Sequence, residues 1–213
     1  MGIAGVITGD IISSTTIRTE WKQIILDTIQ NSAQDLKALS PLKLEFFRGD
    51  SFQIVVDNPA EALKIAVLLR AGLKSNTPNE SEYQWDARMA LGVGKIDYAP
   101  DKVVISDGEA FRYSGWEFDE LGKKKLAIRT PWKDTNEELK VNTGFADEII
   151  SGWSIPQAQA IYWSILHWQM SQKEIAAKLN KSAQNISKLL STGKEPLIRL
   201  YLERYTQIIT KRE

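Results

Sequence analysis

Two aspartates that each follow a glycine stand where predicted strands end, and together they could hold a cation. Asp10 ends the apolar run VITGD, and Asp50 lies in the RGD turn between the runs LEFF and SFQIVV. In a β-α-β-β order the first strand lies beside the later hairpin, so the two carboxylates are expected to converge. Neighbouring carboxylates repel each other unless a cation lies between them. Mg²⁺ or Mn²⁺ suits this site, because it takes one or two carboxylates and completes its shell with water and phosphate oxygens.

The residues around these aspartates carry donors that a phosphate group uses. Ser13 and Ser14 add hydroxyl groups to the backbone N–H groups of the segment after Asp10. Arg48 and Arg112 add guanidinium groups, which bind a phosphate through two parallel hydrogen bonds. We therefore expect a phosphorylated ligand or a nucleotide at this end of the sheet.

The same residues also have plain structural explanations. An Asp after a strand commonly forms a turn or caps a helix. Arg112 can pair with Glu109 or Glu117 on the surface of one predicted helix. Both explanations remain open alternatives to the ligand site.

The elements that must position these residues alternate between strands and helices. Continuous apolar runs predict strands, and apolar residues spaced three and four apart predict helices. Asn58 and Pro59 mark one helix start as a cap and a first-turn proline. The predicted strands are residues 3–9, 42–47, 51–56, 85–94, 102–106 and 125–130, and the predicted helices are residues 20–39, 58–73, 107–121 and 135–153.

This order predicts an α/β domain with a βαββαβ core, a ferredoxin-like mixed sheet with helices packed on it. Strand signals stop after residue 130, and the chain from residue 154 onward reads as helical. We therefore expect two domains, an α/β domain over residues 1–150 and an all-α domain over residues 151–213.

Residues 171–193 have the pattern of a helix-turn-helix. Ser171 begins a capping box, Asn180 stands at a turn position where a left-handed backbone is common, and Ser182 caps the second helix. Residues 196–209 form a third amphipathic stretch that would pack against both helices. A three-helix bundle used for dimerisation or docking is the alternative interpretation.

The outer face of the second helix favours contact with DNA. Gln and Asn side chains pair with adenine in the major groove, and Lys side chains meet phosphates. Residues 171–213 hold nine Lys or Arg and four Asp or Glu, a net charge of +5 against −5 for the rest of the chain. One such unit binds weakly, so a homodimer would be needed for tight binding. The predicted DNA contacts are Lys181, Ser182, Gln184, Asn185, Ser187 and Lys188.

The aromatic residues and the single histidine of the helical part favour a packed core. Trp153, Trp163 and Trp168 are expected between the two domains, with an aromatic ligand pocket as the alternative. His167 lies in the apolar stretch AIYWSILHWQM without a nucleophile pattern, so we expect a core residue.

Composition places the chain among compact proteins of a reducing compartment. Of 213 residues, 43% are hydrophobic, which is enough for a buried core, and none is cysteine. The start lacks the pattern of a signal peptide, and no apolar run reaches membrane-spanning length. The sequence therefore predicts a cytoplasmic protein without a membrane partner.

Several motifs carry a resemblance to known families. VITGDIISST and FFRGDSFQIVV resemble the two metal-aspartate motifs of class III nucleotide cyclases, ARMALGVGKI resembles their next central strand, and GEAFRYSGWEFDEL resembles their late helix. Nearly the whole chain resembles the SatD family more closely, through ITGDIISS, RGDSFQ, LLRAGLK, SDGEAFRYSG and LAIRTP. This resemblance implies a cyclase-like α/β domain joined to a C-terminal helix-turn-helix.

The cyclase resemblance also implies a ligand set. It makes Asp10 and Asp50 the metal carboxylates and the carbonyl of Ile11 a further ligand of Mg²⁺ or Mn²⁺.

Two groups that active cyclases need are not kept. The position of the purine-reading Lys is Phe46, and the positions of the Asn and Arg on the late helix are Arg112 and Trp116. Losing a preorganised positive group typically costs ~10²–10³ in rate, so ligand binding is expected rather than turnover.

The sequence thus predicts a cytoplasmic SatD-like regulator that binds a phosphorylated ligand with a divalent cation and binds DNA through its helix-turn-helix. Two alternatives remain open. One is a metal-dependent enzyme that acts on a nucleotide by two-metal chemistry. The other is a non-catalytic domain that mediates protein association.

Overall fold

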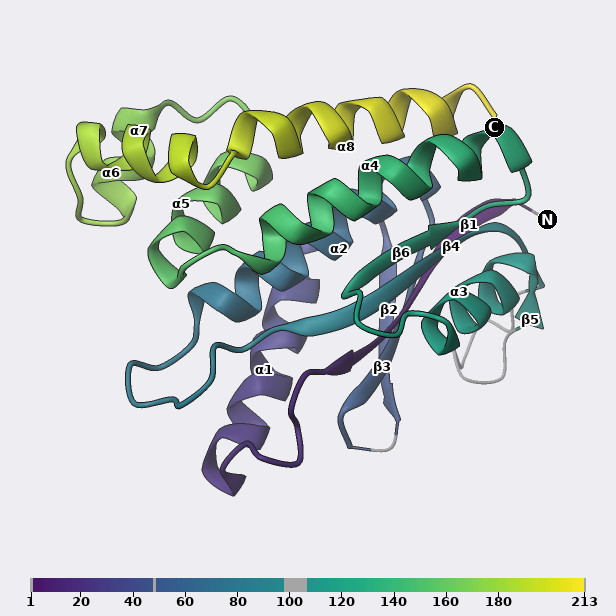
Figure 1. Cartoon of the computed structure of the whole chain (residues 1–213), viewed down its shortest axis with the longest axis horizontal. Coiled ribbons are helices and arrows are strands. Elements are labelled where there is room, and N and C mark those ends of the chain that lie inside the picture. The colour runs from purple at the N-terminus through teal and green to yellow at the C-terminus, as the bar shows by residue number, and fades with distance from the viewer. Residues whose placement is uncertain (1, 48, 98–106, 213) are drawn as a thin grey trace.

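A mixed six-stranded sheet forms the centre of the fold (Figure 1). The computed structural model describes residues 2–47, 49–97 and 107–212. The strand order is β2-β3-β1-β4-β5, and β6 also pairs with β4. The predicted strand at residues 102–106 lies outside the described residues. The strands are β1 (Ile3–Ile11), β2 (Leu42–Phe47), β3 (Ser51–Val56), β4 (Ala87–Asp97), β5 (Asp107–Gly108) and β6 (Leu126–Arg129).

The register of β1 decides which side chains meet at the sheet end. β1 is antiparallel to both β3 and β4, so Asp10 stands opposite Ser51 on one side and opposite Arg88 on the other. Side chains alternate between the faces of a strand. Ile11 therefore points into the main hydrophobic core, and Asp10 points to the opposite face of the sheet.

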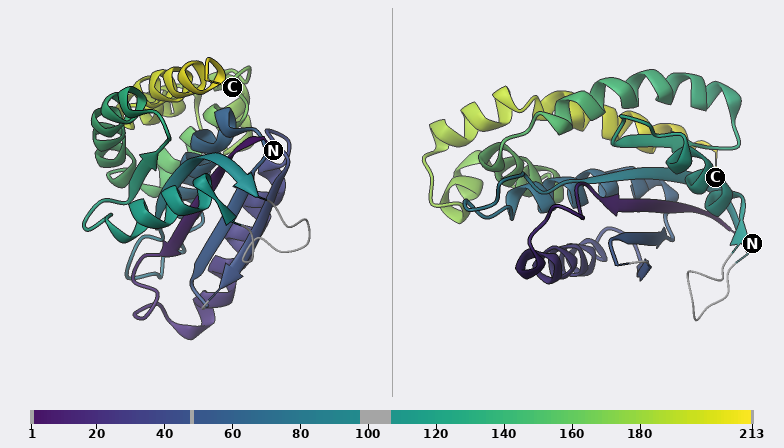
Figure 2. Two further views of the ribbon diagram at one scale, coloured as in Figure 1. Left: turned by 90° about the vertical axis from the view of Figure 1, so that its right-hand side faces the viewer. Right: turned by 60° about the horizontal axis from the view of Figure 1, so that its bottom comes forward.

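Helices cover both faces of this sheet (Figures 1 and 2). α1 (Thr19–Leu36) and α2 (Pro59–Ser75) bury their apolar stripes against one face, and α3 (Glu109–Asp119) packs on the other face, against β1 and β4. A Cβ atom on Gly92 of β4 would lie 2.1 Å from the carbonyl oxygen of Ala110, so only glycine lets α3 approach this closely. Thr8 and Ser114 join β1 to α3 through a buried hydroxyl pair at 2.9 Å.

α2 is buried along nearly its whole length because later helices cover the side that faces away from the sheet. Asn58 caps this helix by accepting a hydrogen bond from the N–H of Ala60, as the sequence predicts. The remaining helices are α4 (Lys133–Ser151), α5 (Ile155–Leu166), α6 (Gln172–Lys178), α7 (Ala183–Thr192) and α8 (Glu195–Thr210).

The helices after residue 150 share one hydrophobic cluster with the sheet. α5 and α8 both pack on α2. The hydroxyl of Tyr205 donates to the carbonyl oxygen of Pro59 at 2.8 Å, and Thr206 donates to that of Ala60 at 3.1 Å. The described chain is therefore a mixed α/β fold whose main core runs from the sheet into the C-terminal helices, and the predicted boundary near residue 150 stays a prediction. In the described ranges, none of the helices combines the length and the apolar character needed to cross a membrane.

Candidate functional site

Asp10, the first predicted metal ligand, forms an ion pair with Arg88 of the neighbouring strand β4. Arg88 donates from Nε to Oδ1 and from Nη2 to Oδ2 of Asp10, both at 2.7 Å. These hydrogen bonds raise the pKa of Arg88 above its usual value, and the negative charge of Asp50 adds to the effect. The guanidinium also lies 5.2 Å from the ring centre of Phe118 on α3. Both carboxylate oxygens of Asp10 are therefore occupied by a group of this chain.

Asp50 lies at the same sheet end but has other partners. Its carboxylate accepts a short hydrogen bond from the hydroxyl of Ser14, and its backbone carbonyl accepts one from Ile11 N at 3.1 Å. Gly49 before it adopts a φ of +80°, which glycine tolerates best. Asp50 lines a cavity of about 250 Å³ together with Ile11, Ser14, Thr15, Ile17, Lys22, Ile25, Leu26 and Gly49.

The two carboxylates do not converge on a common open site. Asp10 is bound to Arg88 and does not line the cavity that Asp50 lines. Within residues 2–47, 49–97 and 107–212, no group of three or more His, Cys, Asp or Glu side chains is arranged to hold a metal ion. As arranged, the donor set does not fit Mg²⁺ or Mn²⁺, because a cation would have to displace the guanidinium from Asp10. The predicted metal ligands Asp10, Ile11 and Asp50 stay untested.

The other predicted phosphate ligands are dispersed. Ser13 is exposed with a φ of 59°, and its carbonyl oxygen accepts hydrogen bonds from Thr16, so it forms a turn. Arg112 pairs with Asp107 at 3.0 Å on the exposed surface and not with Glu109 or Glu117. Arg48 lies outside the described residues. Of this set, the structure places only Ser14 at the cavity beside Asp50.

The predicted local geometry of the helix-turn-helix segment is confirmed. Ser171 and Glu174 form a reciprocal capping box at the start of α6. Asn180 adopts a left-handed φ of 51° in the turn. Ser182 caps α7 by accepting a hydrogen bond from Asn185 N at 3.2 Å. The residues that face inward are Ile175, Ala176, Ile186 and Leu190, all of them buried.

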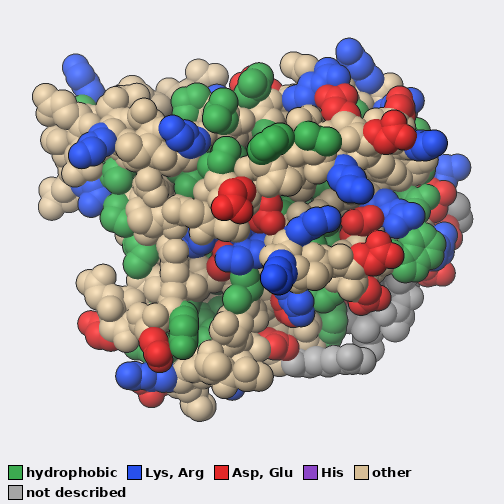
Figure 3. All heavy atoms as spheres, in the orientation of Figure 1, with side chains coloured by type: hydrophobic (Ala, Val, Ile, Leu, Met, Phe, Trp, Pro, Cys, Tyr) green, Lys and Arg blue, Asp and Glu red, His purple; other side chains and the backbone are tan. Residues whose placement is uncertain are grey.

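The outer face of α7 is polar and basic. Lys181 is half-buried and the hydroxyl of Ser182 is used as a cap, whereas the other predicted contacts are exposed. Residues 181–194 contain three lysines and no acidic residue. α6 and α7 lie at the end of the molecule away from the sheet, where Lys and Arg side chains gather (Figures 1 and 3). The exposed predicted contacts are Gln184, Asn185, Ser187 and Lys188.

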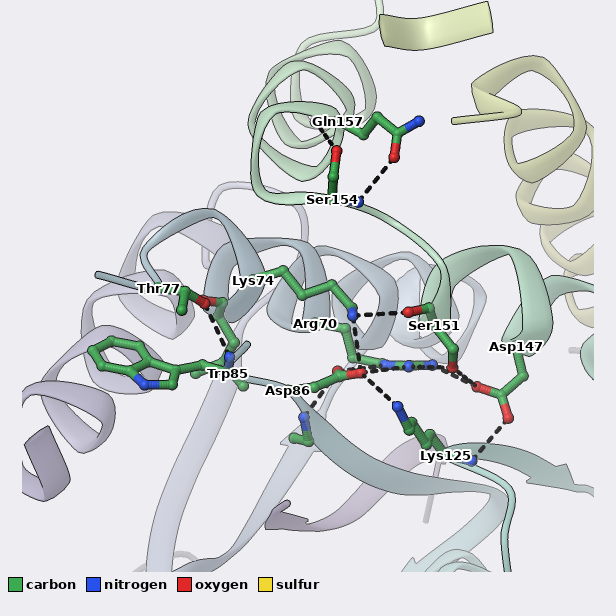
Figure 4. Close-up of polar contacts among 12 residues, drawn as sticks. Arg70, Lys74, Thr77, Trp85, Asp86, Lys125, Asp147, Ser151, Ser154 and Gln157 are labelled. Carbon is green, nitrogen blue, oxygen red and sulfur yellow. Dashed lines mark hydrogen bonds and ion pairs between the residues drawn. The ribbon is translucent and has the colours of Figure 1, made fainter. Parts of the chain in front are cut away.

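A buried ionic network, which the sequence reasoning missed, links α2 to β4 and α4 (Figure 4). Arg70 is fully buried and donates to both carboxylate oxygens of Asp86, at 2.9 and 2.8 Å. It also donates to Asp147 at 2.6 Å. Lys74 lies 3.2 Å from Asp86 and donates to the carbonyl oxygen of Ser151. The signal was present, since Arg70 and Lys74 interrupt the apolar face of a helix at an i, i+4 spacing.

The neighbouring opposite charges of this network shift the pKa values of Arg70 and Asp86 toward their charged forms. Burial raises the pKa of Asp86, but the adjacent positive charges, Arg70 first, outweigh burial and hold this pKa below its usual value. Burial lowers the pKa of Arg70, and the two carboxylates reverse that effect, so the pKa lies above its usual value. For Lys74, burial dominates and the pKa is lowered. Buried charges with saturated partners hold elements together and leave little freedom for chemistry.

Of the three tryptophans, Trp153 is buried as expected, and its position between two domains stays a prediction. Trp153 donates from Nε1 to the carbonyl oxygen of Gly193 at 2.7 Å. The prediction for His167 is wrong, because this residue is exposed at the end of α5 and stacks on Trp163 with ring centres 5.5 Å apart. The helix ends there, which turns the imidazole out of the core.

α4 and α8 present an exposed apolar surface, here called the α4–α8 face. Seven large hydrophobic side chains of the described residues are exposed, and Val141, Phe145, Leu197 and Leu200 are four of them. Of these four, Phe145, Leu197 and Leu200 border a groove of about 410 Å³ between the two helices. Patches of this kind mark interaction surfaces more often than isolated exposed residues do.

Comparison with known proteins gives only remote likenesses. No family model matches the sequence, and no curated protein matches it. The fold is similar to the active GGEEF domain of a diguanylate cyclase from Vibrio cholerae, with 15% identity, 59% of this chain and 82% of that chain covered, and a TM-score of 0.42. It is also similar to a bacterial light-regulated adenylyl cyclase, with 12% identity, 59% and 74% covered, and a TM-score of 0.42. The structural neighbours are thus nucleotide cyclase domains at a remote level, and the resemblance to the SatD family stays a prediction.

Proposed function

We propose that this protein binds duplex DNA, with α7 as the helix that enters the major groove. The observation that carries this proposal is the capped α6–turn–α7 unit, in which the outer face of α7 is polar and basic and residues 181–194 contain no acidic residue. An α-helix fits the major groove, and Gln184 and Asn185 are exposed at its N-terminal end, where recognition helices contact bases. Lys181 and Lys188 supply the phosphate contacts.

Replacing Gln184 and Asn185 by alanine tests this proposal. Each lost bidentate pair costs about 1–3 kcal/mol of discrimination, so Gln184→Ala/Asn185→Ala is expected to weaken specific binding by roughly 5–150-fold for each lost pair. The measurement is fluorescence anisotropy with duplexes enriched by the wild-type protein from a random pool. The matched control is Gln30→Ala/Asn31→Ala, the same residue pair at an exposed position of α1.

Two results would contradict DNA recognition by α7. One is a selection that enriches no sequence, which would leave only charge attraction. The other is equal binding of the enriched duplex by the two double variants, which would assign recognition to another surface.

We also propose that a second copy of this chain covers the α4–α8 face. α4 and α8 run antiparallel, because Glu138 pairs with Arg204 and Thr143 with Tyr201 further along. Two such helix pairs joined face to face make a four-helix bundle. A twofold interface must be self-complementary, and the rim meets this need with charges of both signs around an uncharged centre. A face that binds polyanions or strongly acidic peptides would instead be expected to have a basic rim.

This arrangement serves DNA binding directly. α8 follows α7 after only Gly193 and Lys194, so a dimer through α8 fixes two copies of α7 relative to each other. One unit with few phosphate contacts binds DNA weakly. Two linked units bind the same DNA more tightly.

The cavity beside Asp50 supports a second function, binding of a small phosphorylated ligand. Thr15 and Lys22 line it with donors for an anionic group, and Ile25 gives it an apolar wall. The hydroxyl of Ser14 also lines it but already donates to Asp50. Its volume of about 250 Å³ is below the usual range of about 300–1,000 Å³ for ligand pockets. A phosphate with a small organic group therefore fits better than a whole enclosed nucleotide. The enzyme alternative has less support, because it needs both carboxylates on metal ions.

Thermal melting with a panel of phosphorylated compounds tests the cavity. A ligand at 100 times its Kd stabilises the folded state by about 2.7 kcal/mol, which raises the melting temperature by several degrees. Lys22→Ala is expected to abolish the rise, whereas Lys37→Ala, an exposed lysine just past the end of α1, keeps it. A panel without any stabilising compound, including inorganic phosphate and nucleotides, would argue against the cavity as a ligand site.

A further inference from the structure

We propose that the guanidinium of Arg88 takes the place of a divalent cation at the end of β1, so that this strand end excludes metal ions. This inference concerns the Asp10 side of the sheet and does not depend on DNA binding or on the cavity beside Asp50.

The register of the sheet places Arg88 next to Asp10. Asp10 and Arg88 are directly paired residues of antiparallel β1 and β4, so their side chains leave the same face of the sheet. The neighbours of Arg88 on β4, Ala87 and Met89, are completely buried and hold the strand in place. The guanidinium then reaches Asp10 without any change in the backbone.

The contacts occupy the atoms that a metal ion would need. Two parallel hydrogen bonds of 2.7 Å take up both oxygens of Asp10, which is the geometry of a strong arginine–carboxylate pair. Phe118 flanks the guanidinium from α3, with 5.2 Å from its ring centre to the central guanidinium carbon. An incoming cation would have to break the ion pair and displace the guanidinium from the ring of Phe118. If the guanidinium stayed nearby, the cation would bind next to another positive charge. Like charges at this distance repel.

The charge balance supports the same assignment. Asp50 lies at the same sheet end, because its backbone carbonyl oxygen accepts a hydrogen bond from the N–H of Ile11, the residue after Asp10. The positive charge of Arg88 is thus fixed on Asp10, at the sheet end where the sequence predicts an ion. The carboxylate of Asp50 remains available to the hydroxyl of Ser14 and to the cavity.

Titration with Mn²⁺ alone tests the proposal. Binding is measured by calorimetry and by the electron paramagnetic resonance signal of free Mn²⁺. The wild-type protein is expected to show no saturable binding up to about 1 mM, a Kd that corresponds to only about −4.1 kcal/mol. Arg88→Met keeps the length and apolar stem of the side chain and removes the charge. This variant is expected to bind Mn²⁺ at least about tenfold more tightly.

Two controls assign the gained site to Asp10. Asp10→Asn/Arg88→Met is expected to lose the gained binding. Arg112→Met removes an arginine from another exposed Arg–Asp pair, since its side chain is 47% exposed against 42% for Arg88, and is expected to gain nothing. Arg88→Gln serves as a second neutral variant if circular dichroism shows that Arg88→Met is unfolded.

Two outcomes overturn the proposal. Saturable Mn²⁺ binding by the wild-type protein that matches Arg88→Met would show that Arg88 does not keep metal ions out. Absence of binding in both folded neutral variants would show that no cation position exists for Arg88 to occupy.

Discussion

Arg70→Met is expected to lower the free energy of unfolding by about 3–5 kcal/mol, because it leaves charged groups buried without their partner. Asp147 would lose its ionic partner and keep only backbone and hydroxyl contacts. Asp86 would keep Lys74 at 3.2 Å but lose the fork that contacts both its oxygens. Urea unfolding followed by circular dichroism measures the loss as a shift in midpoint at an unchanged slope.

The control for this prediction separates burial from ion pairing. Arg112 forms a similarly close pair with Asp107, at 3.0 Å, but on the exposed surface. Arg112→Met is expected to change the unfolding midpoint very little, because exposed pairs are screened by water and salt. Equal shifts for the two variants would show that burial of Arg70 does not set the cost.

Phe145→Glu is expected to raise the dissociation constant of the proposed dimer by about 100-fold or more. Phe145 is the most exposed side chain of the α4–α8 face, at 71%, and borders the groove that a second copy would fill. A carboxylate buried there without a partner costs several kcal/mol, and about 2.8 kcal/mol already corresponds to 100-fold. Analytical ultracentrifugation over a range of protein concentrations gives the dissociation constant directly.

The control is Trp116→Glu, which places the same charge on an exposed aromatic position outside this face, on α3. That variant is expected to dimerise as the wild-type protein does. Sedimentation of the wild-type protein as a monomer at all concentrations would refute the α4–α8 face as a dimer interface. DNA binding by α7 would survive that result as binding of a single unit.

Local signals allowed much of the fold to be predicted from the sequence. The caps at Asn58, Ser171 and Ser182 lie where the capping residues predict them, and Asn180 adopts the left-handed turn conformation. These features depend on residues within one or two helical turns. The order of strands and helices likewise follows from hydrophobic periodicity, so the mixed α/β class is confirmed in its general form.

The contacts at the sheet end could not be predicted in the same way, because they depend on register between distant segments. The pairing of Asp10 with Arg88 joins residues 78 positions apart, and a shift of β4 by one residue would turn Arg88 to the other face. A sequence pattern shows two acids at strand ends, but it does not show which cation the fold brings to them. Arg88 is the only charged residue of the otherwise apolar motif ARMALGVG, and this was the one available sign.

The buried ionic network could not be predicted from the sequence for the same reason. Arg70 meets Asp147 across 77 residues, and only the packing of α4 over α2 makes that contact. The i, i+4 pair of Arg70 and Lys74 in an apolar helix signals that buried charges need partners, but not which carboxylates supply them.

The hydrogen bond from Tyr205 to Pro59 also affects how the chain folds during its synthesis. These residues are 146 positions apart, and a ribosome adds about 5–20 residues per second, so roughly 7–30 s pass between them. For that interval the side of α2 that α5 and α8 later cover remains without its native neighbours. The nascent chain therefore carries a long apolar helix whose outer side stays uncovered until the segments that form α5 and then α8 have been made.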